Sequence, residues 1–334
     1  MGNLSGIRFI CNKSNDFMIS EDSWVYKSNS ETSLVRVTQV GLCNSDYSRL
    51  FLGSGHKYPI TLGHEIVGRV EASDSKTQQL SSNFVCIFPL IPCKTCQECK
   101  KDTYNLCSNY SYLGSRQDGG LSSYIEVPNW NIMEINKQID STFLPMIEPI
   151  SVIFHSFRSL PANRSNLLIT GSGFLSYLAL KVGRFLGFKE IRVISTSKSN
   201  GTLFEDLFLN SSELSSAAFD SCIDLSGNVE VISEVTRLLL PKSKIVTLAN
   251  ARSDTYLNAE SRERIVRKEL SYQGSWNSSY GFSQDDWTMA MDFLSSGPSI
   301  NFPFSEVLLK ELPVFLESLS RRSPKERIHV RCSD

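Results

Sequence analysis

Four cysteines lie close together in the stretch PCKTCQECKKDTYNLC, which covers residues 92–107. Cys93, Cys96, Cys99 and Cys107 have the spacing C-x2-C-x2-C-x7-C. Zinc prefers four tetrahedral ligands, and four thiolates fill that shell without leaving a position for substrate. The spacing matches neither common ferredoxin pattern, so an iron–sulfur cluster is the less favoured metal. We predict a structural zinc site, with unliganded thiols as the alternative, although a reducing environment rarely tolerates such a group at a surface.

A second set of metal-ligating side chains is dispersed along the chain. Cys43 lies in GLCNSD, His64 and Glu65 lie in GHE, and Glu148 lies in MIEPISV. Mixed sulfur, nitrogen and oxygen donors with one open position are what a catalytic zinc site requires. Each residue also has an ordinary explanation, because a lone cysteine is usually core and a lone histidine usually structural. Residue types alone do not show that these side chains meet.

A glycine turn in LLITGSGFLS follows a short apolar run and precedes a segment with helical spacing. In a dinucleotide-binding turn, Gly171 permits the tight bend and Gly173 lets the backbone approach the pyrophosphate. The helix that begins at Phe174 and Leu175 adds the positive end of its dipole. The third position of the pattern is Ser176 instead of glycine, which we expect to be tolerated with some strain.

The end of the second expected strand lacks the acidic residue that binds the ribose hydroxyls of NAD. Ser195 occupies that position, in VISTSKSN. Hydroxyls of Ser195, Thr196 and Ser197 can donate to a 2′-phosphate, and Lys198 can add positive charge. We therefore predict NADP(H) in preference to NAD(H). The alternative is a neutral loop with weak selectivity.

The elements that must position these residues change character along the chain. Residues 1–155 contain short alternating or apolar runs broken by polar turns, which are typical of strands. Strands and helices alternate from residue 156 to residue 292, which predicts a doubly wound parallel sheet. The segment 293–334 contributes one helix and one strand. The fold class is therefore α/β, with a β-rich domain (1–155 plus 293–334, including a metal lobe at 93–107) and a cofactor domain (156–292).

Bulk composition excludes several classes of protein. The chain has 334 residues, 41% hydrophobic and 21% charged, with a net charge of −1. Such a balance argues against nucleic acid or an anionic membrane as partner. We find no apolar run long enough to span a membrane and no signal peptide, so we expect a cytoplasmic protein. Nine cysteines, an odd number, also argue against a disulfide framework.

The order of these motifs resembles that of the zinc-dependent medium-chain dehydrogenases/reductases. GLCNSD, YPITLGHEIVGRV, the four-cysteine lobe, GSRQDGG, EPISV and the glycine turn follow one another as in that family. Within it the chain is most similar to the branch of galactitol-1-phosphate 5-dehydrogenase and sorbitol dehydrogenase. The resemblance implies a GroES-like catalytic domain, a Rossmann cofactor domain, and two zinc ions per chain, one catalytic and one structural.

By this resemblance, Cys43, His64 and Glu148 hold the catalytic zinc, and Glu65 is a direct or exchanging ligand. Asp46 supports the ligands, and Ser45 falls where the family places its proton-relay hydroxyl. The implied reaction is hydride transfer between the nicotinamide and a polyol or ketose whose oxygen is bound by zinc as a Lewis acid. His155 lies outside the metal signature and is more readily explained by helix packing.

Three residues are candidates for binding the substrate, for which we expect a polyol or sugar phosphate. Arg116 suits a bidentate grip on phosphate, with a surface ion pair to Asp118 as the alternative. Tyr47 can contact a sugar hydroxyl. Trp276 lies in the polar and aromatic stretch GSWNSSY and is otherwise core. If NADPH is the cofactor, we expect the enzyme to reduce a ketose phosphate to an alditol phosphate.

Two other functions stay open at the level of the sequence. The stretch at Ser195 is similar to the cinnamyl-alcohol dehydrogenase branch, which suggests a zinc reductase of simple aldehydes. A nucleotide-binding protein without catalytic activity is disfavoured because the set Cys43, Ser45, His64 and Glu148 is complete. Relatives are usually dimers or tetramers, so we expect a homo-oligomer.

Overall fold

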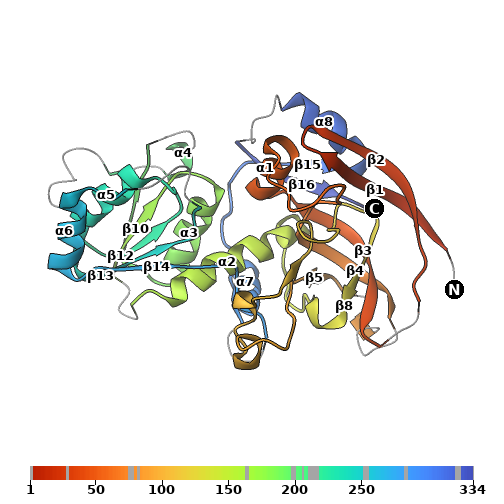
Figure 1. The fold of residues 1–334 in the computed structure, drawn as a ribbon, viewed down its shortest axis with the longest axis horizontal. Coiled ribbons are helices and arrows are strands. Elements are labelled where there is room, and N and C mark those ends of the chain that lie inside the picture. The colour runs from red at the N-terminus through yellow and green to blue at the C-terminus, as the bar shows by residue number, and fades with distance from the viewer. Residues whose placement is uncertain are drawn as a thin grey trace. The chain divides into compact units, whose positions relative to one another are not determined.

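The computed structural model describes residues 3–27, 30–73, 79–80, 83–161, 165–196, 201–204, 207–209, 218–250, 256–281, 285–319 and 325–333. The chain divides into two compact units (Figure 1). Unit 1 comprises Met1–Glu148, Tyr280–Gly297 and Pro303–Asp334, and unit 2 comprises Pro149–Ser279 and Pro298–Phe302. The sequence prediction sets its boundaries at 155/156 and 292/293.

Unit 1 is built on a seven-stranded sheet with the order β15-β16-β3-β4-β5-β9, in which β8 also pairs with β3. These strands are β3 (Thr32–Gly41), β4 (Glu65–Ser73), β5 (Val85–Ile87), β8 (Tyr124–Pro128), β9 (Ile132–Glu134), β15 (Phe304–Leu308) and β16 (Arg327–Arg331). Smaller antiparallel pairs are β1 (Leu4–Lys13) with β2 (Asp16–Trp24), and β6 (Leu90–Ile91) with β7 (Ser111–Tyr112).

Apolar side chains of β3 and β4 supply the centre of the unit 1 core. Val35, Val37 and Val40 of β3 are fully buried. Because β-branched residues pack well on a pleated surface, the run SLVRVTQV favours a strand. Helices α1 (Asn44–Leu52) and α8 (Leu312–Ser318) close the same core through Leu50 and Leu312. The other helical segments of this unit are η2 (Cys99–Lys101), η3 (Tyr104–Leu106), η4 (Asn129–Asn131), η5 (Ser141–Met146), η8 (Leu309–Glu311) and α7 (Asp286–Ser295).

Unit 2 contains a five-stranded parallel sheet with the order β11-β10-β12-β13-β14. Its strands are β10 (Asn166–Thr170), β11 (Glu190–Ile194), β12 (Phe219–Asp224), β13 (Leu239–Thr247) and β14 (Ser271–Gly274). Its helices are α3 (Phe174–Phe185), α4 (Gly201–Phe204), α5 (Val229–Leu238) and α6 (Ala259–Lys268), and α2 (Ile147–Arg158) begins at the end of unit 1. From β10 the chain passes to β11 on one side of that strand, and then crosses to β12 on its other side. The carboxyl end of β10 is therefore a topological switch point.

The predicted fold class is confirmed, because a β-rich unit accompanies a parallel sheet of the doubly wound type. Leu167, Leu168 and Ile169 of β10 are fully buried, as expected for a central parallel strand. Gly187 follows α3 with a φ of 84°, the left-handed conformation that commonly ends a helix. None of the helices in the described part of the chain has the length and apolar character needed to cross a bilayer.

Candidate functional site

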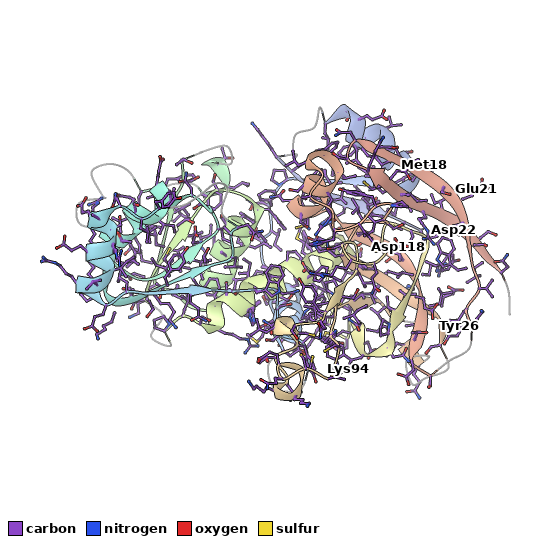
Figure 2. The ribbon with its side chains drawn as sticks, viewed as in Figure 1. Met18, Glu21, Asp22, Tyr26, Lys94 and Asp118 are labelled. Carbon is purple, nitrogen blue, oxygen red and sulfur yellow. The ribbon has the colours of Figure 1, made fainter. Side chains whose placement is uncertain are left out.

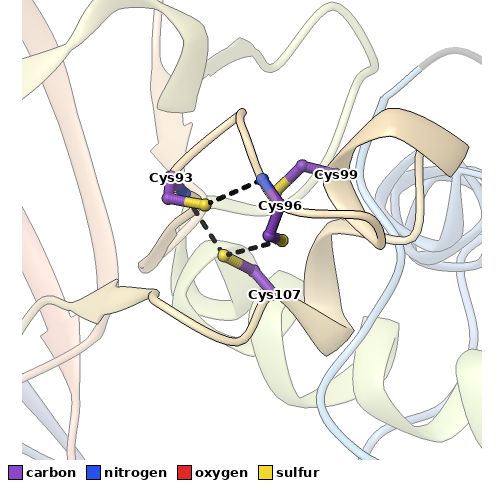
Figure 3. A group of neighbouring side chains, drawn as sticks. All are labelled: Cys93, Cys96, Cys99 and Cys107. Atoms are coloured by element: carbon purple, nitrogen blue, oxygen red, sulfur yellow. Dashed lines mark hydrogen bonds between the residues drawn. The ribbon is translucent and has the colours of Figure 1, made fainter.

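The four clustered cysteines converge as their spacing predicts (Figure 3). All four Sγ atoms lie within 4.8 Å of one another, and those of Cys96 and Cys107 are 3.9 Å apart. Sulfur atoms of a tetrahedral zinc site, at Zn–S distances of about 2.3 Å, lie roughly 3.8 Å from each other. The geometry of this cluster therefore fits a zinc ion with a closed shell.

Backbone hydrogen bonds prepare this cluster for a cation. N–H groups of Cys99 and Ser108 lower the pKa of Cys96 to about 5, because they stabilise its thiolate. The Thr95 hydroxyl and nearby N–H groups lower the pKa of Cys93 to about 7. Burial raises the pKa of Cys99 to about 12. Hydrogen bonds thus stabilise the thiolate forms of Cys93 and Cys96, and a metal ion would supply the charge that the buried Cys99 thiol needs.

Aromatic packing joins the four-cysteine lobe to the rest of unit 1. Lys94, labelled in Figure 2, places its ammonium 5.1 Å from the centre of the Trp130 ring. Trp130 also packs edge-on against Tyr104 and Tyr280, each with ring centres 4.9 Å apart. The lobe is therefore held by apolar contacts as well as by its own backbone.

A second group of donors forms around the amino end of α1. Cys43, His64 and Glu65 place one ligand atom each within 4.8 Å of the others. Cys43 precedes the helix, and its N–H donates to Asp46 Oδ2 at 3.0 Å. Asp46 Oδ1 lies 3.5 Å from His64 Nδ1, so one buried carboxylate orients both the cysteine and the histidine.

Close backbone packing places His64 and Glu65. Gly119 and Gly120 run beside the segment that precedes His64, and their N–H groups donate to the carbonyls of Thr61 at 2.8 Å and Gly63 at 2.9 Å. A Cβ on Gly119 would lie 2.2 Å from the Gly63 oxygen, so only glycine permits this approach. The motifs GHE and GSRQDGG are therefore one structural feature. β4 begins at Glu65, opposite Gly41 of β3.

The charges of this group depend on one another. Burial alone would lower the pKa of His64, but Asp46 and Cys43 raise it well above the ordinary value. Burial would likewise raise the pKa of Cys43, and the His64 imidazole lowers it. His64 and Arg49 together lower the pKa of Asp46 against the effect of its burial. The Cys43 thiolate, the protonated His64 ring and the Asp46 carboxylate thus stabilise one another, and a zinc ion would take the place of the His64 proton in this donor set.

Glu148 lies beside this group instead of within it. Among the described residues, the group with ligand atoms inside 4.8 Å contains Glu65 and not Glu148. Burial raises the pKa of the Glu148 carboxyl, while the charge of His64 and a hydrogen bond from Tyr112 lower it. The sequence makes Glu148 the third ligand and Glu65 a direct or exchanging one. The geometry instead favours Glu65 as the nearer carboxylate.

Two arginines and a tyrosine of the site were missed at the level of the sequence. Arg327 of β16 forms a buried ion pair with Glu65, and its Nη1 donates to the Leu42 carbonyl at 2.5 Å. Arg49 Nη1 donates to Ser45 Oγ at 2.9 Å. The Tyr112 ring packs edge-on against His64, with centres 5.7 Å apart. No motif or spacing marks these residues, because their roles arise from strand pairing and loop packing.

In unit 2, the glycine turn has the form that a pyrophosphate requires. Gly171 has a φ of 87°, and its N–H donates to the Ile194 carbonyl at 2.8 Å. A Cβ added to Gly173 would meet no atom within 4 Å, which leaves the start of α3 open to a ligand. Phe174 and Leu175 form the first turn of α3. Ser176 is buried, and its hydroxyl has a partner, because Oγ donates to the Thr170 carbonyl at 3.2 Å.

Ser195 lies just beyond β11, and its Oγ donates to Ser172 Oγ at 3.3 Å. Thr196 is exposed, and Ser197 and Lys198 lie outside the described residues. A buried carboxylate at the end of a different strand, Asp224 of β12, accepts hydrogen bonds from Thr170 Oγ1 at 2.6 Å and Thr247 Oγ1 at 2.8 Å. Asp224 therefore links β12 to β10 and β13, and its carboxylate is occupied by hydrogen bonds from these strands.

The predicted substrate residues have different surroundings. Arg116 is exposed and stacks on Tyr110, 4.5 Å from the ring centre. The alternative ion pair with Asp118 is wrong, because Asp118, labelled in Figure 2, pairs with Arg8 at 3.1 Å. The Tyr47 hydroxyl is buried, with no hydrogen-bond partner among the described residues.

The last two candidates lie in unit 2. Trp276 is half exposed, so its alternative assignment to the core is wrong. His155 Nδ1 lies 3.4 Å from Ser279 Oγ, a contact within unit 2 that agrees with a packing role for α2.

Unit 2 has a parallel sheet with a glycine turn at its switch point. Unit 1 has a four-cysteine group that fits a fully coordinated metal ion and a second group with sulfur, nitrogen and oxygen donors. Together these features define a metal-dependent dinucleotide oxidoreductase. The alcohol dehydrogenase GroES-like domain matches residues 29–137. Galactitol 1-phosphate 5-dehydrogenase of Escherichia coli (strain K12) is 31% identical over 278 residues, 78% of this chain and 80% of that protein. The chain belongs to the zinc-dependent medium-chain dehydrogenases/reductases and is an enzyme of the alcohol and polyol dehydrogenase type.

Two further comparisons extend over almost the whole chain. D-arabitol-phosphate dehydrogenase of Enterococcus avium is 24% identical over 323 residues, 90% of this chain and 88% of that protein. The crystal structure of galactitol-1-phosphate dehydrogenase from Escherichia coli superposes with a TM-score of 0.88 at 25% identity, covering 97% of this chain and 99% of that one. The predicted family is therefore confirmed in sequence and in fold.

Proposed function

We propose that this enzyme transfers a hydride between NADP(H) and a polyol or ketose, that its substrate is a sugar phosphate, and that it holds one catalytic and one structural zinc ion. The observation that carries the proposal is the buried group of Cys43, His64 and Glu65, a mixed donor set that fits a zinc ion able to bind substrate. Two relatives named as dehydrogenases of polyol phosphates support the choice of substrate class.

Cys43, His64 and Glu65 would hold the catalytic zinc, with Glu148 beside them, and Cys93, Cys96, Cys99 and Cys107 would hold the structural one. When bound, zinc supplies Lewis-acid activation of the substrate oxygen, and the nicotinamide supplies or accepts the hydride. Asp46 fixes the orientation of the His64 ring, and Arg327 neutralises part of the charge on Glu65. Glu148 and Tyr112 share a hydrogen bond at the margin of the site.

Ser45 is the proposed carrier of the substrate proton. A serine hydroxyl has one hydrogen to donate and two lone pairs to accept. Arg49 Nη1 occupies one lone pair of Ser45 Oγ at 2.9 Å. The hydroxyl hydrogen and the other lone pair can therefore serve a substrate oxygen, with water or the cofactor ribose as the next member of the relay.

The proposed preference for NADP(H) rests on the absence of a carboxylate at Ser195. A carboxylate at that position would repel a 2′-phosphate, whereas a hydroxyl can donate to it. Asp224 lies at a strand end too, but its carboxylate accepts hydrogen bonds from Thr170 and Thr247. We also propose that the enzyme is cytoplasmic and forms a dimer or tetramer. Tyr47, Arg116 and Trp276 are proposed to bind its substrate.

A panel of ketose phosphates and their unphosphorylated counterparts, assayed with NADPH and NADH, tests this function. The protein should first be shown by elemental analysis to contain two zinc ions per chain. We expect turnover of a ketose phosphate, with kcat/KM higher for NADPH than for NADH. Replacing Ser195 by Asp should reverse that cofactor preference, because the carboxylate binds ribose hydroxyls and repels the 2′-phosphate. A clear preference of the unmodified enzyme for NADH, or turnover of cinnamaldehyde without any sugar, would contradict the proposal.

A further inference from the structure

Arg49 places a fixed guanidinium beside the candidate zinc ligands. It lies in the last turn of α1, on the same helical face as Ser45, and its carbonyl accepts a hydrogen bond from the Tyr58 hydroxyl at 2.6 Å. Its Nη1 donates to Ser45 Oγ at 2.9 Å and lies 3.6 Å from Asp46 Oδ1. Only 14% of the side chain is exposed. The charge of Arg49 is therefore held in place and poorly screened by water.

Most of the donor capacity of Arg49 is unused. A guanidinium has five N–H donors in a planar fork. Both contacts of Arg49 within the described residues involve Nη1. Its Nε is buried without a hydrogen-bond partner, and no described side chain or carbonyl accepts a bond from Nη2. Nε and Nη2 form one edge of the fork, and this edge has no acceptor among the described residues.

Arg49 is the cation near the zinc ligands whose donors are least occupied. Asp46, Glu65 and Glu148 disfavour an anion, so a phosphate needs a cation with unused donors, and the other arginine at the site, Arg327, is already engaged by Glu65 and by the Leu42 carbonyl. The field of Arg49 also extends to the margin of the site. Burial and Glu148 raise the pKa of Tyr112, and Arg49 opposes that rise. A dianionic group bound beside the zinc ligands could therefore take its hydrogen bonds from Nε and Nη2 of Arg49.

We propose, resting on the function proposed above, that Arg49 binds the phosphate group of the substrate through its Nε and Nη2 edge and so selects phosphorylated over unphosphorylated polyols. Two parallel N–H···O bonds from one guanidinium edge are the geometry in which arginine recognises phosphate. Arg116 differs because it is exposed to water and stacked on Tyr110. Arg49 is thus the specificity determinant, and Arg116 contributes less.

Kinetics on matched substrates test this assignment. The variants are Arg49→Met, Arg49→Lys and Arg116→Met, with Arg331→Met as control, since the one ion pair of Arg331 with a described residue is an exposed one with Glu306 at 3.5 Å. Each is assayed on a ketose phosphate and on the same ketose without phosphate. Arg49→Met should lower kcat/KM for the phosphorylated substrate by about 10- to 100-fold, mainly through KM, because a charge-assisted bidentate contact is lost. Because Arg49→Met also removes the contact with Ser45 Oγ, we expect some loss on the unphosphorylated ketose too, so the assignment is tested by the ratio of the two kcat/KM values, which should fall by about 10-fold or more. Arg49→Lys should give an intermediate fall in this ratio, because lysine keeps the charge but not the fork.

Calorimetric titration with inorganic phosphate gives a readout that does not depend on turnover. We expect the zinc-loaded enzyme without cofactor to bind phosphate, and Arg49→Met to weaken that binding while Arg331→Met does not. Zinc content is measured for every variant. If Arg49→Met loses zinc or fails to fold, the ratio measured for Arg49→Lys decides instead.

Two results would overturn the assignment of Arg49. One is an equal loss on both substrates, which indicates a structural role through Ser45, and the other is a phosphate-specific loss in Arg116→Met alone. Turnover of unphosphorylated polyols only would refute the role of Arg49 while leaving a polyol dehydrogenase. Absence of turnover on every polyol and ketose would refute the proposed function itself.

Discussion

Gly41 shows how a residue without a side chain makes room for Glu65, a proposed zinc ligand. A Cβ on this residue would lie 2.0 Å from Glu65 Oε2, in a buried site where Arg327 already holds the carboxylate. We predict that Gly41→Ala displaces Glu65 and lowers kcat/KM by at least about 100-fold, because an error of about 1 Å in a reacting group has that effect. Elemental analysis and steady-state kinetics would measure the change.

Gly274→Ala is the matched control for this substitution. An added Cβ there would meet no atom within 4 Å, so activity should be unchanged. A fully active Gly41→Ala enzyme with two zinc ions would show that Glu65 has no part in binding the catalytic metal.

Residue types and spacing predicted the cysteine cluster, since few side chains bind zinc and their spacing is restrictive. The meeting of Cys43 with His64 was predicted only through the resemblance to the dehydrogenase family. The sequence did not rank Glu65 above Glu148 as a zinc ligand. Glu65 at the start of a strand and Glu148 at the start of a helix are both plausible positions for a ligand. It also gave no sign of Arg49 or Arg327. An arginine has no distinctive spacing, and each of these acquires its role from a fold that brings distant segments together.

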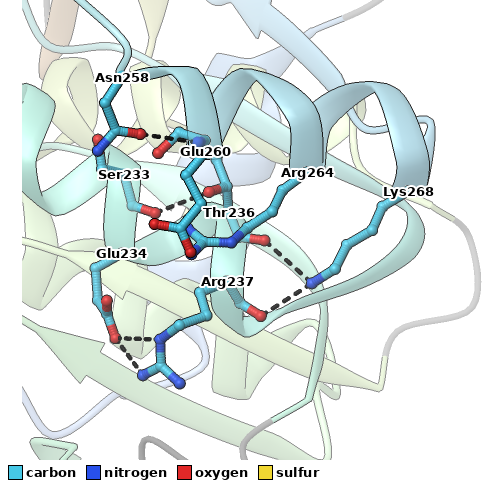
Figure 4. A network of polar contacts seen from close by, with 9 residues as sticks. Ser233, Glu234, Thr236, Arg237, Asn258, Glu260, Arg264 and Lys268 are labelled. Atoms are coloured by element: carbon cyan, nitrogen blue, oxygen red, sulfur yellow. Dashed lines mark hydrogen bonds and ion pairs between the residues drawn. The ribbon is translucent and has the colours of Figure 1, made fainter.

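At the scale of elements, α6 stabilises the end of α5 (Figure 4). The ammonium of Lys268 donates to the carbonyls of Thr236 at 3.1 Å, Arg237 at 2.9 Å and Leu239 at 2.6 Å. The last carbonyls of a helix have no partners within it, and a cation there also favours the helix dipole. One side chain thus completes the carboxyl end of α5 and fixes α6 beside it.

We predict that Lys268→Met lowers the free energy of unfolding by about 1–3 kcal/mol, because carbonyls that are partly buried lose a charged donor. Urea denaturation followed by circular dichroism measures the change. Lys242→Met is the control, since within the described part of the chain the Lys242 ammonium pairs only with Glu269, at a highly exposed position, and its loss should change stability by less than about 1 kcal/mol. Equal effects of the two substitutions would refute the capping role of Lys268.

Elements with a clear hydrophobic period could be predicted from the sequence, whereas the order of the strands in the sheets was harder to predict. The helix from Phe174 to Phe185 and the apolar run of β10 follow directly from apolar spacing. Pairing of β16 with β3 does not, because short strands of similar composition occur throughout unit 1 and nothing local selects the partner. Ser176 was expected to be tolerated with some strain where α3 packs on β10, and it is buried there with its Oγ donating to the Thr170 carbonyl at 3.2 Å.

At the scale of the whole molecule, stability depends on pH through a buried histidine. His329 lies in β16, stacked on Phe304, and burial together with the charge of Arg327 lowers its pKa to about 3. In the unfolded chain the pKa of histidine is about 6.5. Between these values the unfolded state binds a proton that the folded state does not, so stability falls as pH falls from about 6.5 toward 3.

We therefore predict a steeper loss of stability between pH 7.5 and pH 5 in the unmodified enzyme than in His329→Gln. The difference in slope should approach about 1.4 kcal/mol per pH unit below pH 6, the contribution of one proton. Urea denaturation across this range provides the measurement, and loss of zinc at low pH affects both proteins alike. Identical slopes would mean that His329 is accessible to protons in the folded state.

The position of β16 has a consequence for how the polypeptide is made. This strand lies between β3 and β15, and Val330 is paired with Val40, although almost the entire chain separates them in sequence. While the ribosome is still translating unit 2, β3 has an unfilled edge and Glu65 lacks its arginine. The five strands of the parallel sheet in unit 2 end at Gly274, so we infer that this sheet can form during synthesis, whereas the large sheet of unit 1 waits for β16 to emerge.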